Sequence, residues 1–340
     1  MKKIALIGWG YWGRNYAKYF DTKIDAQLLY VCDLREDMLA DAKRLYPHIT
    51  ITKNIQDLII NKVDGVILAS PASIHFKLAS ILLNARIPVL IEKPLTDSLK
   101  TSQELAVLAK KTHTKILVGH TFLYNQSVRY LKSEIDKGNF GKLYYLEFKR
   151  QSYGPIRDDV NIMWDFAPHD VAISRYLLGN IDPITIYATA GKFSKNDKED
   201  IAIIVMKFPG NVMVNINVAW LYPIKIRNLT VLGDKKMAIF EDINSSEPVK
   251  IFDTTLRYPK ENDPAGASFR LGDIHIPRIP AIDPLATQLR HFVSYLKGEE
   301  QPLTPVEDGV AVVAILEAIN QSIQTGKEIT FRTWLTSHEK

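Results

Sequence analysis

Two kinds of hydrophobic pattern divide the chain. Up to about residue 120, short apolar runs of the kind found in strands buried on both faces alternate with stretches whose apolar residues recur at helical spacing. The apolar runs are KIALIG, LLYVCD, VDGVILA, IPVLIE and KILVGH, and the helical stretches include REDMLADAKRLY and HFKLASILLNA. This alternation predicts a doubly wound parallel sheet covered by helices.

After about residue 140 the pattern changes to side-to-side alternation. The alternating segments are KLYYLEFKRQSY, TIYATAGKF, DIAIIVMKF, NVMVNINVAW, KIRNLTVLG and MAIFED, with turn signals such as FPGN and LGDKK between them. They predict a large open, mainly antiparallel sheet with one wetter face, followed by a long excursion over 254–284 and two helices within 285–297 and 305–325. We therefore expect a first domain over 1–122 and an α/β domain over 123–340 that the helices of 285–325 close.

Composition adds limits on partners and location. The 340 residues are 46% hydrophobic and 24% charged, as in an ordinary globular protein, and a net charge of +5 spread without a basic stripe does not favour nucleic acid. Anionic small molecules remain plausible ligands. The single cysteine, Cys32, cannot form an internal disulfide, and no apolar run is long enough to span a membrane, so we expect a cytoplasmic protein.

The glycine-rich segment GWGYWG, residues 8–13, follows the first strand directly and precedes a helix. In this setting Gly8 permits a tight turn, Gly10 lets the backbone approach a pyrophosphate, and Gly13 lets helix and strand pack closely. Tyr11 and Trp12 would then lie at the helix N-terminus beside the phosphates. The alternative is a glycine-rich turn that binds nothing. The context favours a dinucleotide site in a Rossmann domain.

Asp33 ends the second strand, about 20 residues after this motif, where a carboxylate accepts hydrogen bonds from the adenosine ribose. A 2′-phosphate would be repelled there, so the position favours NAD over NADP. Arg35 weakens this inference, because its side chain can swing toward a phosphate, although it can equally be a solvated residue at the start of the next helix.

Two further motifs complete a set of three. Ala69-Ser70-Pro71 with His75 follows the fourth strand, and Glu92-Lys93-Pro94 follows the strand IPVLI. In this order the motifs resemble those of the Gfo/Idh/MocA oxidoreductases, and the resemblance covers nearly the whole chain. The loop before Glu92 departs from the usual AGKHV pattern with ARIPV, away from the motif's chemistry.

The resemblance implies a nicotinamide-dependent dehydrogenase that acts on a CH–OH group, with a Rossmann domain followed by an α/β domain. It implies that Lys93 reaches both substrate and nicotinamide, and that a cis Lys93–Pro94 bond aims it. Ser70, Pro71, His75 and Glu92 would lie beside the cofactor, with His75 structural or cofactor-adjacent rather than catalytic.

The stretch WDFAPHD, residues 164–170, puts Asp165 and His169 four residues apart. By itself it favours a helix cap at Asp165 with Pro168 in the first turn; proton transfer and metal binding are the alternatives. The resemblance assigns both residues to catalysis with Lys93. His169 in the first turn of a helix would be kept neutral, as a base must be, while Asp165 would orient it. No cysteine or histidine cluster suggests a metal.

Substrate contacts are expected near these motifs. GHTFLYN (119–125) and the segment 283–309 resemble a branch of the family that acts on nucleotide sugars, with a UDP-N-acetylglucosaminuronate-like substrate oxidised at C3 for surface-polysaccharide precursors. Arg150, Arg157 and Asn161 suit a carboxylate or diphosphate, although Arg157 can instead pair with Asp158 or Asp159 at the surface. Tyr124 and Asn125 are expected to line the substrate cleft, although Tyr124 can instead enter the core. His120 is expected to pack at a strand end, and His291 to lie on a helix surface.

Two other functions stay open: a dehydrogenase of a free polyol or sugar, and a dinucleotide-binding regulator without catalysis. The joint presence of Lys93, Asp165 and His169 argues against the regulator. The apolar outer face of the open sheet predicts a homodimer or homotetramer. The expected ligands are NAD and a small-molecule sugar, with neither a membrane nor a nucleic acid as partner.

Overall fold

The computed structural model describes residues 1–20, 24–154, 156–157, 159–195, 197–253, 255–257, 268–270 and 272–338. The chain forms two compact units, one made of Met1–Tyr124 and Ile282–Ala314 and the other of Asn125–Ala281 and Ile315–Lys340. Part of the excursion expected over 254–284 lies outside the described residues.

The first unit is built on a six-stranded sheet in the order β3-β2-β1-β4-β5-β6, with every neighbouring pair parallel. Its strands are β1 (Lys2–Ile7), β2 (Ala26–Cys32), β3 (Thr50–Thr52), β4 (Gly65–Leu68), β5 (Val89–Glu92) and β6 (Ile116–Gly119). The order reverses direction between β1 and β4, which is where such sheets bind ligands at the carboxyl ends of their strands. The predicted doubly wound sheet is confirmed.

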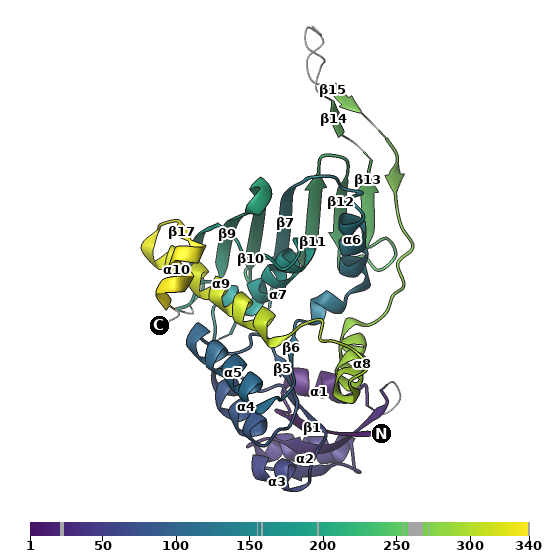
Figure 1. Ribbon diagram of the computed structural model, residues 1–340, viewed down its shortest axis with the longest axis vertical. Coiled ribbons are helices and arrows are strands. Elements are labelled where there is room, and N and C mark those ends of the chain that lie inside the picture. The colour runs from purple at the N-terminus through teal and green to yellow at the C-terminus, as the bar shows by residue number, and fades with distance from the viewer. Residues whose placement is uncertain are drawn as a thin grey trace. The chain divides into compact units, whose positions relative to one another are not determined.

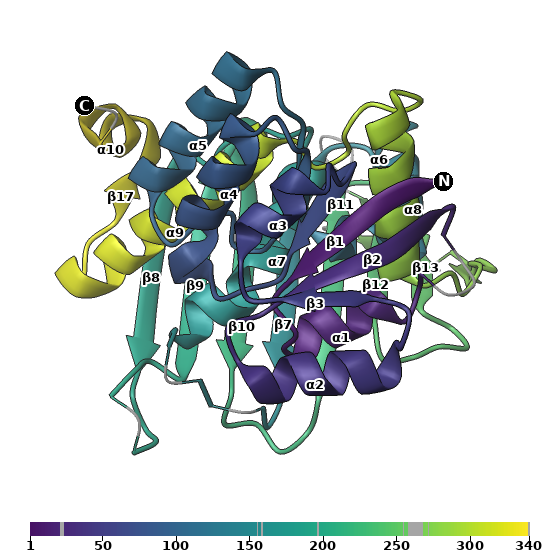
Figure 2. The ribbon, with the colours of Figure 1, turned by 90° about the horizontal axis from the view of Figure 1, so that it is seen from below.

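Helices cover both faces of this sheet (Figure 2). One face carries α1 (Tyr11–Ala17) and α2 (Glu36–Leu45), and the other carries α3 (Ile55–Ile60), α4 (His75–Asn84) and α5 (Leu99–Thr112). Two short 3-10 turns, η1 (Ala72–Ile74) and η2 (Thr121–Tyr124), follow β4 and β6.

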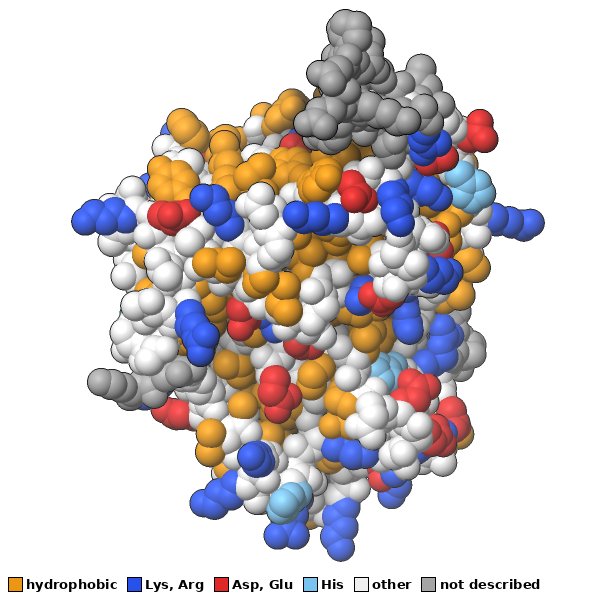
Figure 3. Space-filling view, turned by 45° about the horizontal axis from the view of Figure 1, so that its top comes forward, with side chains coloured by type: hydrophobic (Ala, Val, Ile, Leu, Met, Phe, Trp, Pro, Cys, Tyr) orange, Lys and Arg blue, Asp and Glu red, His pale blue; other side chains and the backbone are white. Residues whose placement is uncertain are grey.

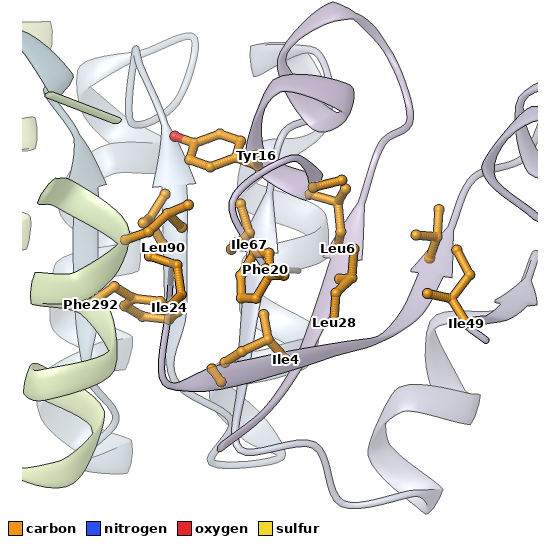
Figure 4. Packing of buried hydrophobic residues seen from close by; sticks show 14 of the residues in the cluster. Ile4, Leu6, Tyr16, Phe20, Ile24, Leu28, Ile49, Ile67, Leu90 and Phe292 are labelled. Atoms are coloured by element: carbon orange, nitrogen blue, oxygen red, sulfur yellow. The ribbon is translucent and has the colours of Figure 1, made fainter. Parts of the chain in front are cut away.

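The two C-terminal helices form where expected, but they are shared differently between the units. Leu289 and Phe292 of α8 (Pro284–Lys297) pack into the buried cluster of the first unit with Ile4 and Leu90 (Figure 4). The unit boundary falls inside α9 (Val306–Thr325), after Ala314. The boundary expected at 122/123 placed both helices in the second domain, whereas α8 and the start of α9 belong to the first unit. The sequence could not show this, because an amphipathic helix reveals which of its faces is apolar but not which sheet that face covers.

The second unit holds a nine-stranded sheet in the order β16-β13-β12-β11-β7-β10-β9-β8-β17. Its strands are β7 (Leu143–Gln151), β8 (Thr185–Gly191), β9 (Ile201–Phe208), β10 (Val212–Ala219), β11 (Ile226–Gly233), β12 (Met237–Glu241), β13 (Val249–Phe252), β16 (Ile274–His275) and β17 (Ile329–Thr330). A separate pair joins β14 (Thr255–Arg257) to β15 (Ser268–Arg270). Among the described strand pairs of the nine-stranded sheet, only β7 and β10 run parallel. The predicted mainly antiparallel sheet is therefore confirmed.

One face of this sheet is buried under α7 (Ile162–Leu177), which lies across β7, β9 and β10 (Figure 1). The unit also contains α6 (Gln126–Asp136), α10 (Phe331–His338) and the part of α9 that follows Ala314. On the opposite face of the sheet, the alternate residues of the strands point outward and expose Tyr187, Ile203 and Met213. In the described part of the chain, no helix has both the length and the apolar character that crossing a bilayer requires.

Candidate functional site

The glycine-rich turn between β1 and α1 leaves room for a ligand at one glycine only. Gly8 has a φ of +96°, and a Cβ there would lie 2.7 Å from the Ala69 carbonyl oxygen. At Gly13 a Cβ would lie 1.9 Å from the Gly8 oxygen, so both positions are required by the fold's own packing. At Gly10 a Cβ would meet nothing within 4 Å, and this residue borders a surface hollow of about 440 Å³. Gly10 is therefore open to a group that comes close to the backbone, as a dinucleotide phosphate does.

The neighbouring residues also suit a dinucleotide. Ser70 follows β4 beside Gly8, and its buried Oγ atom has no hydrogen-bond partner within the described residues. Buried hydroxyls are normally paired, so this atom is available to a ligand. Tyr11 is 76% exposed and Trp12 38% exposed in the first turn of α1, while Pro71 is exposed before η1.

Asp33 lies one residue beyond β2 and is 9% exposed. Its Oδ2 atom accepts the Trp9 N–H at 2.8 Å, and its Oδ1 atom accepts the Arg35 N–H at 3.0 Å. The Arg35 guanidinium forms an ion pair with the same carboxylate, with Nη2 3.0 Å from Oδ2. Burial raises the pKa of Asp33, but the hydrogen bonds from Arg35 and Trp9 outweigh it and hold the pKa below its usual value. Asp33 and Arg35, the two residues that bear on the choice between NAD and NADP, are thus paired with each other. The preference for NAD over NADP stays a prediction.

The Lys93 turn begins where β5 ends, and the Lys93–Pro94 bond is cis, as predicted. Glu92 is 5% exposed, so its side chain is buried in the first unit. Its Oε2 atom accepts the Lys93 N–H at 3.1 Å, and its Oε1 atom accepts the hydroxyl of Tyr16. A direct cofactor contact by the Glu92 carboxylate stays a prediction, and Tyr16 is a partner that no sequence motif indicated.

His75, the first residue of α4, connects the loops after β4 and β5. It is 1% exposed, with Nε2 2.8 Å from the Ser70 oxygen and Nδ1 3.1 Å from the Pro94 oxygen and 3.2 Å from the Leu95 oxygen. Burial lowers the pKa of His75, although the surrounding carbonyls oppose that effect. These contacts give His75 a structural role, and its place beside the cofactor stays a prediction.

Burial supports one of the two interpretations of Tyr124 and corrects the expectation for His291. Tyr124 is 1% exposed and its hydroxyl lies 2.8 Å from Nδ1 of His291, whose Nε2 lies 2.8 Å from the Gln301 oxygen. Tyr124 is therefore a core residue rather than a substrate contact, and His291 is buried rather than on a helix surface. The reason is that α8 packs onto the first unit and covers both side chains. His120 is buried at the end of β6, as expected.

In the second unit, α7 begins earlier than the sequence suggested. Asn161 is its N-cap and accepts the Trp164 N–H at 3.1 Å, while its Nδ2 atom donates to Glu199 at 3.2 Å. The expected cap at Asp165 is wrong: this residue lies inside the first turn, Pro168 is inside the helix, and His169 lies about two turns from the start. The effect of the helix dipole, which falls off within the first turn, is therefore weak at His169.

Asp165 is held by two donors from other segments of the unit. Its Oδ1 atom accepts from Nη1 of Arg157 and its Oδ2 atom from Nε1 of Trp220, both at 3.2 Å. Arg157 also pairs with Asp159, with Nη2 2.5 Å from Oδ2, whereas Asp158 lies outside the described residues. His169 is partly exposed, but its Nδ1 atom is buried. Within the described ranges, no group of three or more His, Cys, Asp or Glu residues is placed to hold a metal ion.

Arg150 forms a buried contact that the sequence did not indicate. It is 6% exposed and forms a buried ion pair with Asp170, with Nη2 2.6 Å from Oδ1. Burial raises the pKa of Asp170, and the Arg150 charge opposes that rise. These contacts give Arg150 a structural role, and its substrate contact stays a prediction. Asp170 was missed, because a charged residue inside an amphipathic helix does not reveal its partner.

A second charged pair lies next to the first. Arg227 of β11 is directly opposite Arg150 of β7 in the sheet, and its Nη1 atom is 3.5 Å from Oδ2 of Asp242. Asn125 donates to Oδ1 of Asp242 at 3.2 Å, and its own Oδ1 accepts the Ser127 N–H at the start of α6. Asn125 thus caps a helix and orients Asp242, and its predicted contact with substrate stays a prediction.

Comparison with known proteins gives two matching family models. Residues 2–120 match the oxidoreductase family with an NAD-binding Rossmann fold (GFO_IDH_MocA), and residues 128–239 match the GFO/IDH/MocA C-terminal domain. A UDP-N-acetylglucosamine 3-dehydrogenase from Acidithiobacillus ferrooxidans is 24% identical over 250 residues, covering 72% of this chain and 75% of the relative. A myo-inositol 2-dehydrogenase from Thermotoga maritima is 22% identical over 338 residues, covering 96% of this chain and 98% of the relative. The crystal structure of GenD2 from gentamicin A biosynthesis, in complex with NAD, has a TM-score of 0.81 at 22% identity, covering 96% of this chain and 95% of that one.

Proposed function

Because the chain belongs to the Gfo/Idh/MocA family of oxidoreductases, whose N-terminal domain is an NAD-binding Rossmann fold, we propose that it transfers a hydride between NAD and a ring CH–OH group of a nucleotide-linked sugar. One observation carries the proposal. The open glycine Gly10, the unpartnered Ser70 hydroxyl and Lys93 follow β1, β4 and β5, which are neighbours in one parallel sheet. A dinucleotide that lies along the carboxyl ends of these strands passes from the turn toward the lysine.

The residues of this chain have separate roles in the reaction. Bound NAD supplies the hydride acceptor or donor. The Lys93 ammonium stabilises negative charge on the substrate oxygen. His169 takes the hydroxyl proton at Nε2, since its Nδ1 atom is buried. Asp165, one helical turn before it on the same face of α7, orients the ring, and Arg157 and Trp220 fix Asp165 in turn.

The proposed substrate is a UDP-N-acetylglucosaminuronate-like sugar, oxidised at C3 during synthesis of surface-polysaccharide precursors. The relative from A. ferrooxidans, named for a UDP-N-acetylglucosamine 3-dehydrogenase activity, supports the nucleotide-sugar class. The myo-inositol 2-dehydrogenase, which matches over a larger share of both chains, supports a free polyol as the second candidate. Arg157 and Asn161 lie before the first turn of α7, and we propose that the guanidinium binds the substrate's carboxylate or diphosphate.

The outer face of the nine-stranded sheet is proposed as the contact between copies of the chain. Tyr187, Ile203 and Met213 are 43%, 45% and 44% exposed there. Hydrophobic side chains also gather on the upper part of the surface in Figure 3, among interspersed charges. Covering such a face stabilises a dimer or tetramer by removing apolar area from water. A cytoplasmic location stays a prediction, based on the single unpaired Cys32.

A turnover screen separates the candidates. NADH formation is measured with UDP-N-acetylglucosaminuronate, UDP-N-acetylglucosamine, myo-inositol and free hexoses, with the His169→Ala variant as the inactive control. Turnover confined to UDP-sugars supports the proposal, and turnover confined to myo-inositol or hexoses replaces it with the second candidate. Binding of NAD and UDP-sugars without turnover would identify the non-catalytic regulator.

A further inference from the structure

A buried hydrogen-bond chain joins the helix after the glycine-rich turn to the strand that ends before Lys93. Tyr16 of α1 is 0% exposed, and its hydroxyl donates to Oε1 of Glu92, the last residue of β5. The other carboxylate oxygen of Glu92 accepts the Lys93 N–H at 3.1 Å. One carboxyl group therefore connects α1 with the backbone of the lysine turn.

The surroundings of this carboxyl group leave it little freedom. Gln288 of α8 is 0% exposed, and its Oε1 atom lies 3.5 Å from the Tyr16 hydroxyl and accepts from Oγ1 of Thr121 at 2.8 Å. Gly119 pairs with Glu92 across β5 and β6, and a Cβ there would lie 2.9 Å from the Glu92 Cα. The glutamate is thus enclosed by α1, α8 and β6 and cannot turn toward water.

The Tyr16 hydroxyl has a specific reason to be retained. Its ring belongs to an otherwise apolar cluster (Figure 4), in which phenylalanine would pack as well. A buried carboxylate, however, is costly unless donors stabilise it. Burial raises the pKa of Glu92, and the hydrogen bond from Tyr16, the charge of Lys93 and the Lys93 N–H oppose that rise. The hydroxyl therefore serves the glutamate and not the packing of the cluster.

We propose that Tyr16 is a positioning residue, which acts through Glu92 to hold the backbone of Lys93 relative to the glycine-rich turn. The inference rests on the proposed function, in which Lys93 acts on the substrate. Tyr16 lies within one helical turn of Gly13. The segment proposed to bind the dinucleotide and the segment that carries the lysine are therefore joined by two hydrogen bonds to one carboxyl group.

The variant Tyr16→Phe tests this, with Tyr124→Phe as its matched control. Both tyrosines are buried in the first unit with a bonded hydroxyl, but Tyr124 bonds to His291. Because hydrogen bonds to charged groups are the stronger ones, we expect kcat to fall about tenfold in Tyr16→Phe and less than about twofold in Tyr124→Phe. The acid limb of the kcat–pH profile should move to higher pH in Tyr16→Phe alone, since Glu92 loses a donor that lowers its pKa.

A measurement without cofactor gives an independent readout. The carboxyl carbon resonance of Glu92, assigned by its absence in Glu92→Gln, should titrate at higher pH in Tyr16→Phe than in the unchanged protein. Glu92→Gln should reproduce the loss of kcat, and the double variant should lose no more than the larger single loss, because both changes break one chain. If Tyr16→Phe does not fold, this carboxyl titration in a Tyr16→Met variant, which also lacks a donor to Glu92, takes its place, with the same expected direction.

Two results would overturn the inference: equal kcat losses in Tyr16→Phe and Tyr124→Phe, or an unchanged titration of Glu92. Failure of the proposed function is recognised separately, by Lys93→Ala keeping normal turnover. In that case the role of Tyr16 in positioning Lys93 for the reaction fails with it, whatever Glu92 does.

Discussion

The guanidinium of Arg150 and the carboxylate of Asp170 form a buried two-point ion pair, with Nη2 2.6 Å and Nε 3.1 Å from Oδ1. Asp170 directly follows His169 in α7, so the pair fixes the turn that carries the proposed base against β7. A charge pair of this kind is costly to break, because the remaining partner is left buried and unpaired.

Asp170→Asn should therefore destabilise the protein strongly. We expect a loss of about 3–5 kcal/mol in the free energy of unfolding, because the Arg150 charge would stay buried without its counter-ion. Asp159→Asn is the control, since it removes a carboxylate from a partly exposed pair with Arg157, for which about 1 kcal/mol or less is expected. Urea unfolding of both variants measures this, and similar small losses in the two would show that the buried pair does not stabilise α7.

His169→Ala should abolish most turnover while leaving the fold intact. A positioned base contributes about 10²–10⁴-fold to the rate, whereas the partly exposed ring fills little of the core. We expect kcat to fall on that scale, with the NAD dissociation constant and melting temperature nearly unchanged. Asp165→Asn should lose less turnover, since it only orients the ring.

The helix cap is tested separately, because the structure places it at Asn161 rather than Asp165. Asn161→Ala should cost about 1 kcal/mol of stability. Normal turnover in His169→Ala, or a loss of stability with unchanged kcat in Asp165→Asn, would return WDFAPHD to a purely structural role.

Asp33→Ala should weaken NAD binding and reduce the ratio by which the protein prefers NAD over NADP. The carboxylate offers charged acceptors to the ribose hydroxyls, and such hydrogen bonds contribute about 1.5–3 kcal/mol, or roughly 10–100-fold in affinity. The change also releases Arg35 from its ion pair, so that a 2′-phosphate could be bound. Fluorescence titration with both cofactors measures the two constants. Equal affinity for NAD and NADP in the unchanged protein would contradict the role given to Asp33.

Cys32 should be inert to alkylation in the folded protein. It is 5% exposed at the end of β2, and burial together with the charges of Asp33 and Asp57 raises its pKa to about 11. Since the thiolate is the reactive form, iodoacetamide at pH 8 should label the native protein far more slowly than the urea-unfolded one. Mass spectrometry follows the modification, and equal rates in the two states would show that β2 opens readily.

The sequence by itself determined the elements that are defined by local pattern. Continuous apolar runs and helical spacing predicted the parallel sheet, and strict alternation predicted the open one, because a side chain's face follows directly from its position along a helix or strand. The glycine turn was also predictable, since GWGYWG is contiguous and its chemistry depends on neighbours within the same turn, whereas the cis bond of EKP followed from the family resemblance and not from a local pattern.

Only the tertiary structure decided which partners these elements meet. Tyr16 and Glu92 are 76 residues apart, and Tyr124 and His291 are 167 apart, so no local pattern connects them. For the same reason Arg150 was predicted as a substrate contact: an arginine on an alternating strand is equally consistent with solvent, ligand or a buried carboxylate. The packing of α7 on β7 and of α8 on the first sheet settled these cases, because burial leaves a charged or hydroxyl group only the partners that the fold brings within hydrogen-bond distance.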